Sequence, residues 1–552
     1  MGPLNEEVLI TLLPETLVPP TATSKLQHLN TWVQDCISSH PTCRPPASLR
    51  FRYPTRLLCV NQPGDTHIHL IETTTTTTTT PISGPYNVLS YRWGAFQPVK
   101  LLKLTRPTFL TTGIPISSLP QTPMDAITTT RAMSISFLWI DALCIIQDSP
   151  ADWASEARTM ADVYGHAHLS LAASHNIDST GGLFPKRSGS SRGQPIPIRF
   201  PTNPEWALPH HDFQLVEHNF WNNRVEDAPL NTRGWVVQER ILAPRTVHFG
   251  FDGPLFECRE TRLSLTRLDL SIGQSARRLI LPVRARLERR PRAFAKYWAA
   301  VVQYYTGRDL SFGSDRPVAV AGIARALQAV AGKKMEYMAG MWSRGLLRWL
   351  LWEAAEQGGG EAGRYRAPSW SWLAVGGRVF YDTDLIQGFR YLKTGAHAKV
   401  VKWRLVTGDG TEFGAMTAGY LQLRVVLVPI DIEKDGSIFD ARLGGESLSG
   451  TGLGRWILEG HLSWSWDAEL DEAMVRRNNQ QGGSIFAMPI METAPTKSSE
   501  DVCLYALLIE RVNLRGQNDV YRRVGILTVF GTTREAKADE VLDRDKTAIR
   551  LI

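Results

Sequence analysis

Cysteine is scarce in this chain of 552 residues, and long apolar runs are missing. The six cysteines are scattered, which is typical of reduced thiols in a cytoplasmic protein rather than of a disulfide framework. The N-terminus lacks a basic start followed by an apolar core, so no secretory signal is expected. The best candidate for a membrane span, residues 338–352, is interrupted by Ser343, Arg344 and Arg348. We therefore expect a cytoplasmic protein without a membrane span.

Nucleotide-binding and repeat signatures are also missing. The chain has no GxxxxGK[ST] phosphate loop and no WD, ankyrin or TPR period. The formal net charge of +7 is small for this length. Basic residues gather locally, as in residues 284–292 (RARLERRPR), which we interpret as a solvated helix face or a linker. A nucleic-acid patch is the alternative there, but no nucleic-acid partner is expected.

The most informative stretch is residues 137–174, which predicts a βαβ unit. Phe137–Ile140 has the aromatic and β-branched content of a buried strand, and Asp141 follows at its carboxyl end. Apolar residues then recur at helical spacing over residues 150–165, with Asp152 as a candidate cap. A second buried strand follows at residues 168–173. Such units pack into mainly parallel sheets.

Two further stretches predict parts of the same sheet. Residues 86–94 (YNVLSYRWG) predict a strand that ends at Ser90 to Arg92 before a sharp turn at Trp93-Gly94. Residues 232–243 predict a helix that Pro244 stops, and residues 246–249 predict the last core strand. The predicted fold class is α/β, with a mainly parallel sheet and flanking helices.

Together these three stretches resemble the fungal heterokaryon-incompatibility (HET) domain. That family carries a YxxLSYxWG box, a WIDALCINQ box with a following DW…M…Y helix, and a RGWxxQERxLxPRxLHF box, and all three occur here in order. The sequence departs from the family at Ile146, where Asn is usual. The resemblance implies a role in fungal non-self recognition, programmed cell death and innate-immunity-like signalling, with protein partners.

The order of elements also resembles the more distant TIR domain. The TIR positions match Ser90-Tyr91, Asp141, Ser174 and the segment Trp235 to Glu239. Some TIR domains cleave NAD, so this resemblance implies NAD as a substrate and Glu239 as the catalytic residue, with no cofactor firmly implied. The substrate-binding residues would be Ser90, Tyr91, Arg92, Trp93, Asp141, Ser174 and Trp235.

Two alternatives to an enzyme remain open. Glu239 can instead form a salt bridge with Arg240 or Arg245 that locks its helix. The domain can also act as a non-catalytic signalling scaffold that self-associates, because TIR-like sheets commonly act by assembly.

Cys36, His40 and Cys43 have side chains that suit zinc. A fourth ligand at suitable spacing is missing, although Cys59, His67 or His69 could be brought near, so no metal site is predicted. The loop histidines His210, His211 and His218 are not at metal-binding spacing.

We divide the chain into four parts. Residues 1–83 are an N-terminal arm with a poly-Thr loop, and residues 84–260 are the HET-like domain. Residues 261–364 carry aromatic stripes at helical spacing and are predicted to be helical. Alternating apolar segments predict a β-rich C-terminal region at residues 365–552. Within the arm, we expect a helix at residues 26–37 and a hairpin from residues 55–60 and 67–71.

Overall fold

The chain forms two compact units, Met1–Leu281 (unit 1) and Pro282–Ile552 (unit 2). The computed structural model describes residues 9–12, 22–44, 51–60, 64–73, 82–95, 99–184, 196–199, 212–216, 220–251, 253–264, 291–331, 335–355, 365–382, 386, 392–393, 397–432, 438–443, 446–447, 461–467, 484–493, 501–512, 519–532 and 546–552. Among the helices in these ranges, none is long and apolar enough to cross a membrane.

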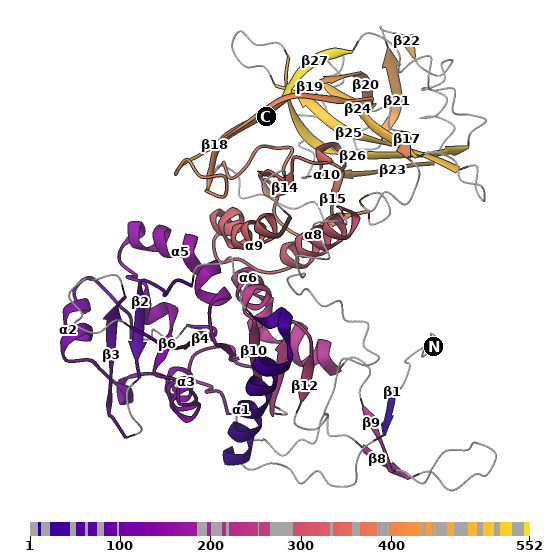
Figure 1. Cartoon of the computed structure of the whole chain (residues 1–552). Helices are drawn as coiled ribbons and strands as arrows, with labels where there is room; N and C mark the ends of the chain where they lie inside the picture. Colours follow the sequence, from indigo (N-terminus) through magenta and orange to yellow (C-terminus); the bar gives the residue numbers. More distant parts are fainter. Residues whose placement is uncertain are drawn as a thin grey trace. The chain divides into compact units, whose positions relative to one another are not determined.

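Unit 1 is built on a nine-stranded sheet within its described residues (Figure 1). Its strands are β2 (Arg56–Cys59), β3 (His67–Glu72), β4 (Tyr86–Ser90), β5 (Ile114–Pro115), β6 (Phe137–Trp139), β7 (Leu169–Ala172), β10 (Arg245–Gly250), β11 (Gly253–Cys258) and β12 (Arg262–Ser264). Their order across the sheet is β12-β11-β10-β7-β4-β6-β2-β3-β5. A separate small sheet has the order β1-β9-β8, from β1 (Leu9–Leu12), β8 (Ile196–Arg199) and β9 (Asp212–Val216).

The helices of unit 1 lie between and around these strands. They are α1 (Ala22–Ser39), α2 (Arg106–Thr111), α3 (Gln121–Ala132), α4 (Asp141–Cys144), α5 (Pro150–Gly165) and α6 (Gly234–Leu242). Shorter helical turns are η1 (Pro41–Cys43), η2 (Ile116–Ser118), η4 (Asn222–Glu226) and η5 (Pro229–Thr232).

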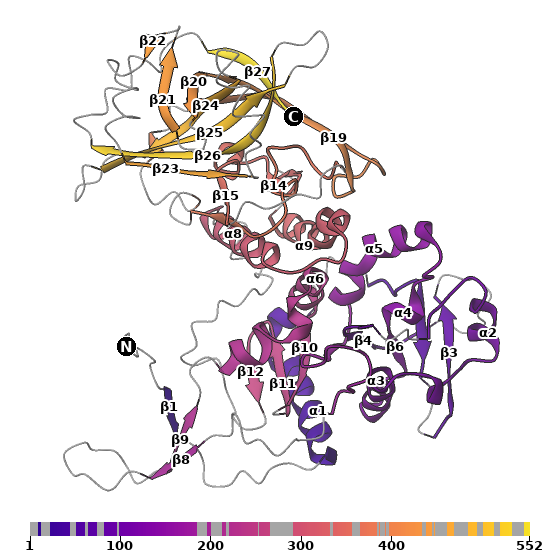
Figure 2. The same cartoon turned by 180° about the vertical axis from the view of Figure 1, so that it is seen from behind.

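The middle of the large sheet is a parallel, doubly wound core. β6, β4, β7 and β10 lie side by side in this order and are parallel. Numbered along the chain, these four strands have the spatial order 2-1-3-4. Right-handed crossovers place α3 and α5 on opposite faces of the sheet (Figures 1 and 2). Ligands of such sheets bind at the carboxyl edge where the strand order reverses, which here lies between β4 and β7.

The N-terminal segment completes the sheet of unit 1. The hairpin β2–β3 was expected from the sequence, and the structure adds it to the sheet through antiparallel pairing of β2 with β6. Helix α1 packs against β11, with the rings of Trp32 and Phe256 6.0 Å apart. Antiparallel strands therefore flank the parallel core on both sides, and residues 1–83 contribute to one of these flanks.

Helix α5 begins differently from its sequence-based prediction. The side chain of Ser149, not that of Asp152, caps the helix by accepting the backbone N–H of Asp152 at 3.4 Å. The Asp152 carboxylate instead accepts hydrogen bonds from Arg56 on β2, at 2.7 and 2.8 Å. An ion pair across the fold therefore takes the carboxylate that local spacing assigned to the cap.

Unit 2 combines a few helices with an extensive β-sheet. Its helices are α8 (Pro291–Thr306), η6 (Gly313–Asp315), α9 (Arg316–Ala331) and α10 (Leu346–Trp349). The predicted aromatic stripe on α8 is core, because the rings of Phe294 and Trp298 lie 5.0 and 5.4 Å from that of Trp342. Helix α10 ends at Trp349, and a strand begins at Trp352, although the sequence predicted residues 261–364 to be helical.

The described strands of unit 2 pair mostly antiparallel. They are β13 (Tyr337–Met338), β14 (Met341–Trp342), β15 (Trp352–Ala354), β16 (Val379–Tyr381), β17 (Leu392–Lys393), β18 (Lys399–Thr407), β19 (Met416–Val425), β20 (Val428–Ile432), β21 (Ile438–Leu443), β22 (Glu446–Ser447), β23 (His461–Trp466), β24 (Ile485–Thr493), β25 (Asp501–Arg511), β26 (Val520–Thr532) and β27 (Thr547–Leu551). The large sheet runs β18-β19-β27-β26-β25-β24-β20-β21-β22, with β26 and β27 parallel.

The predicted fold class is therefore confirmed: an α/β sheet with a parallel core, a helical segment and a β-rich C-terminal region. The division into four parts at residues 83, 260 and 364 stays a prediction. Three sequence features lie outside the described residues: the loop histidines His210, His211 and His218, most of the poly-Thr tract, and the basic segment before residue 291.

The stability of unit 2 depends on Arg523. Its side chain is fully buried and donates to Asp467 at 2.7 and 3.1 Å, and to the carbonyls of Leu350 and Trp352. We predict that Arg523→Met destabilises unit 2 by about 3–5 kcal/mol, because it leaves a buried, unpaired carboxylate. Urea unfolding of the full chain measures this change.

The neighbouring ion pair offers a matched control. Arg522 is half exposed where it pairs with Glu510 at 2.6 Å, so Arg522→Met should cost about 1 kcal/mol or less. Equal losses for the two variants would contradict the assignment of Arg523 as the buried anchor.

Candidate functional site

Polar side chains gather at the carboxyl edge of the parallel core. Ser90 is the last residue of β4, and Asp141 is the first residue of α4, directly after β6. Because side chains alternate along a strand, Ser90 lies on the same face as Tyr86, whose hydroxyl donates to the carbonyl of Val163 on α5. Helix α6 packs against α5 and brings Glu239 to this edge.

Glu239 is the centre of this cluster. Its side chain is buried, with 6% of the residue exposed, and its Oε2 accepts a hydrogen bond from the hydroxyl of Ser90. Burial raises the pKa of Glu239, because a charged carboxylate loses its hydration there. The Arg233 guanidinium and the Ser90 hydroxyl act in the opposite direction, and the nearby Asp141 raises the pKa further.

Two members of the cluster were not predicted as site residues. Tyr164, on α5, is buried beside the carboxyl of Glu239, and its hydroxyl donates to the carbonyl of Leu89 at 3.5 Å. Arg233 precedes α6 and donates to the carbonyl of Tyr91 at 2.6 Å, which places its charge near both Asp141 and Glu239. Both residues belong to the sequence boxes quoted above, but nothing in the local spacing of those boxes indicates that they approach Glu239.

Asp141 and Trp93 form the second half of the cluster. The indole N–H of Trp93 donates to both carboxylate oxygens of Asp141 at 3.1 Å, and the backbone N–H of Ala142 donates to Oδ1 at 2.7 Å. Burial nevertheless raises the pKa of Asp141, while Arg233 opposes this effect. Two carboxyls with raised pKa therefore share one guanidinium at this edge.

Tyr91 and Arg92 continue the edge beyond Ser90. Tyr91 is 2% exposed, and its hydroxyl has no hydrogen-bond partner among the described residues. Burial raises the pKa of Tyr91 well above its usual range. Arg92 is partly exposed and donates to the carbonyl of Pro229 at 2.9 Å. Arg92 therefore ties the end of β4 to η5, just ahead of α6.

Ser174 and Trp235 contact other groups. The hydroxyl of Ser174 lies 3.1 Å from Nδ1 of His248, whose Nε2 lies 3.3 Å from the Glu257 carboxylate. These contacts have the order of a Ser-His-acid relay, and Ser174 is 0% exposed. Trp235 is partly exposed and packs edge-on against Trp153 of α5, at 6.3 Å.

The comparison with known families addresses the same segment. The family model described as Heterokaryon incompatibility protein (HET) matches residues 86–239. This segment matches the HET domain. No curated protein and no solved structure matches the chain significantly. The match begins with β4 and ends at Glu239, so the cluster at the sheet edge lies within the HET domain.

The two cations predicted to pair with Glu239, Arg240 and Arg245, contact other groups instead. Arg240 pairs with Glu226 at 2.8 Å and with Glu257 at 2.6 Å, and Arg245 donates to the carbonyl of His168 at 3.0 Å. Burial alone would raise the pKa of Glu257, but Arg240 and the neighbouring Arg262 hold it well below its usual range. Arg240 and Arg262 therefore belong to a separate buried network of unit 1.

The departure from the family pattern at Ile146 is accommodated by the backbone. The N–H of Ile146 donates to Oδ2 of Asp152 at 2.8 Å, and the side chain of Ile146 is half-buried. The following residue, Gln147, donates through its side chain to the carbonyls of Asp141 and Ile145, at 3.0 and 2.9 Å. These contacts hold the loop behind Asp141 without an amide side chain at position 146.

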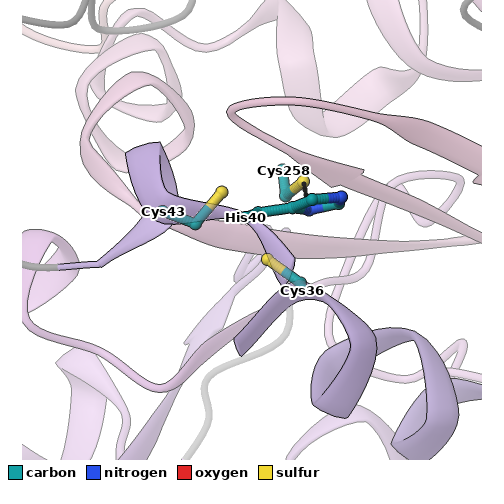
Figure 3. A group of neighbouring side chains, drawn as sticks. All are labelled: Cys36, His40, Cys43 and Cys258. Carbon is teal, nitrogen blue, oxygen red and sulfur yellow. Dashed lines mark hydrogen bonds between the residues drawn. The ribbon is translucent and has the colours of Figure 1, made fainter. Parts of the chain in front are cut away.

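A second cluster in unit 1 has the chemistry of a metal site. The ligand atoms of Cys36, His40, Cys43 and Cys258 all lie within 4.8 Å of one another (Figure 3). The sequence suggested the first three residues and offered Cys59, His67 or His69 as a fourth, but none of these three belongs to the cluster. Cys258, at the end of β11, lies too far away in the chain for spacing to indicate it.

We predict that Glu239→Gln keeps unit 1 folded, whereas Glu239→Ala destabilises it by about 1–3 kcal/mol. The amide can still accept the hydrogen bond of Ser90, but alanine leaves this hydroxyl buried without its partner. Thermal unfolding of the full chain at neutral pH distinguishes these outcomes.

The stability of the wild type and of Glu239→Gln should change differently with pH. Because the folded state holds the proton of Glu239 more tightly, its contribution to stability falls as the pH rises from the ordinary glutamate value through the raised one. Glu239→Gln should therefore gain stability relative to the wild type across that interval. A constant difference across this interval, with a change only below the ordinary glutamate value, would show that Glu239 is held ionised instead.

Proposed function

We propose that this chain is a heterokaryon incompatibility-type protein that takes part in fungal non-self recognition and triggers programmed cell death. The observation that carries the proposal is the match of residues 86–239 to the HET family. The HET domain would be the death effector, in a response that resembles innate immunity. Protein partners would activate it, with unit 2 available to contact them.

A second candidate function is NAD hydrolysis by the same domain. Three observations favour it. The parallel core has a doubly wound strand order, and its carboxyl edge carries the two acids Asp141 and Glu239. The positive charge of Arg233 acts on both of these carboxyls. The resemblance to TIR domains gives Glu239 the catalytic role. Ser90, Arg92, Trp93 and Asp141 would then line the substrate pocket.

The chemistry required of Glu239 is limited. The bond between the ribose C1′ and the nicotinamide nitrogen breaks, and its electron pair leaves with nicotinamide. An ionised carboxylate stabilises the positive charge that develops on the ribose, and water then adds to C1′ and releases a proton. Since burial raises the pKa of Glu239, the active fraction of the enzyme would increase with pH through that raised value.

Expression of the full chain in a filamentous fungus tests the first proposal. We predict loss of viability with the wild-type chain. If the domain is an NAD hydrolase, Glu239→Gln should abolish both the killing and the fall in cellular NAD. Glu336→Gln is the matched control, because that glutamate is exposed and lies in unit 2.

Purified protein separates the candidates further. Full-length wild type, at high concentration to favour self-association, should release nicotinamide from NAD, increasingly so as the pH rises, and Glu239→Gln should release none. Killing by a folded Glu239→Gln chain would exclude the enzyme and leave a self-associating scaffold. A wild-type chain that is folded and expressed at high level but kills no cells would contradict the incompatibility proposal itself, because a high concentration favours self-association without a partner.

A further inference from the structure

The cluster of three thiols and one imidazole in unit 1 is assembled from two distant parts of the chain. Cys36 lies in the last turn of α1, His40 precedes η1, and Cys43 ends η1. Cys258 ends β11, 218 residues beyond His40, and its sulfur lies 3.3 Å from Nδ1 of His40. Figure 3 shows the four side chains converging from the N-terminal segment and the β-hairpin.

The spacing of the four ligand atoms suits a tetrahedral ion. Zinc–sulfur bonds of about 2.3 Å and zinc–nitrogen bonds of about 2.0 Å place neighbouring ligand atoms roughly 3.5–3.8 Å apart around a tetrahedron. All four ligand atoms lie within 4.8 Å of one another, so small side-chain movements suffice to close the shell. Thiolate and imidazole are the ligands that zinc prefers in structural sites.

The surroundings supply the hydrogen bonds that bound thiolates require. The backbone N–H groups of Glu260 and Thr261 donate to the sulfur of Cys258 at 3.4 and 3.3 Å. The guanidinium of Arg245 donates to the sulfur of Cys36 at 3.2 Å, and its charge offsets the excess negative charge of three thiolates around a divalent ion. Such outer contacts orient the ligands and tune the metal.

The loop that carries Cys43 is held in place independently of any ion. Glu260 accepts hydrogen bonds from the backbone N–H of Thr42 at 2.9 Å and from its hydroxyl at 2.6 Å. Arg259 donates to the carbonyl of Thr42 at 3.0 Å. The two segments are therefore fixed against each other, and the three cysteines are buried at 0–3% exposure.

We propose that Cys36, His40, Cys43 and Cys258 bind one structural zinc ion that fastens the N-terminal helix α1 to the end of β11. Four protein ligands fill the tetrahedron and leave no open position for a substrate, so the ion has a structural role. It closes a loop of more than two hundred residues, where a cross-link restricts the unfolded chain strongly.

Metal analysis of the full-length chain tests the site. Protein expressed with zinc and purified without chelators or a histidine tag should contain one zinc per chain, by mass spectrometry of the metal. Cys258→Ser should reduce this content at least tenfold. Cys59→Ser is the matched control and should keep one equivalent, because Cys59 lies on β2, outside the cluster.

Cobalt substitution keeps the test decisive even where Cys258→Ser fails to fold. The wild-type chain with Co²⁺ should show a tetrahedral spectrum with three sulfur-to-cobalt contributions. His40→Cys should retain the ion and increase the charge-transfer intensity by about one third, from three thiolates to four. A folded, reduced wild-type chain that binds neither metal would overturn the proposal, as would a disulfide between two of the cluster cysteines in the freshly purified protein.

Discussion

The buried carboxyl of Glu239 is the constraint around which the HET domain is arranged. A carboxyl taken out of water is costly unless polar groups surround it. Ser90 comes from β4, Tyr164 from α5 and Arg233 from the entry to α6, so the partners of one side chain fix a strand and two helices together. Each of the three sequence boxes therefore contributes a member to this cluster.

The sheet places this polar centre where α/β proteins place their ligand sites. The strand order reverses between β4 and β7, and the cluster lies at the carboxyl ends of the parallel strands. Asp141 and Glu239 both have a raised pKa while a single guanidinium opposes the effect for each. A structural lock and a catalytic centre can both be built from these groups.

Local patterns predicted the elements of the fold and missed the contacts between distant ones. The strands at Tyr86–Ser90 and Leu169–Ala172 and the helix at Pro150–Gly165 follow from apolar periodicity and lie where the sequence places them. The roles of Tyr164 and Arg233 depend on how α5 and α6 pack, which periodicity does not encode. Asp152 fits the pattern of a helix cap, yet its carboxylate pairs with Arg56 on a distant strand instead of capping the helix.

Residues 1–83 show the same limit on a larger scale. The sequence predicts a helix and a hairpin there, and both form, but the hairpin becomes part of the central sheet and α1 covers β11. The fourth member of the thiol cluster, Cys258, is likewise found only through the fold. The HET domain therefore shares its central sheet with the N-terminal segment of unit 1.

The central claim, that Glu239 is a buried carboxyl with a raised pKa, is tested most directly by measuring its protonation. Infrared difference spectra between the full-length wild type and Glu239→Gln, recorded over a pH series, isolate the carbonyl band of the protonated carboxyl. We predict that this band persists above pH 4.5, the ordinary pKa of glutamate, and disappears only at higher pH. A band that vanishes at or below that value would show that Glu239 is an ordinary ionised carboxylate, and would contradict its place as the buried centre of the site.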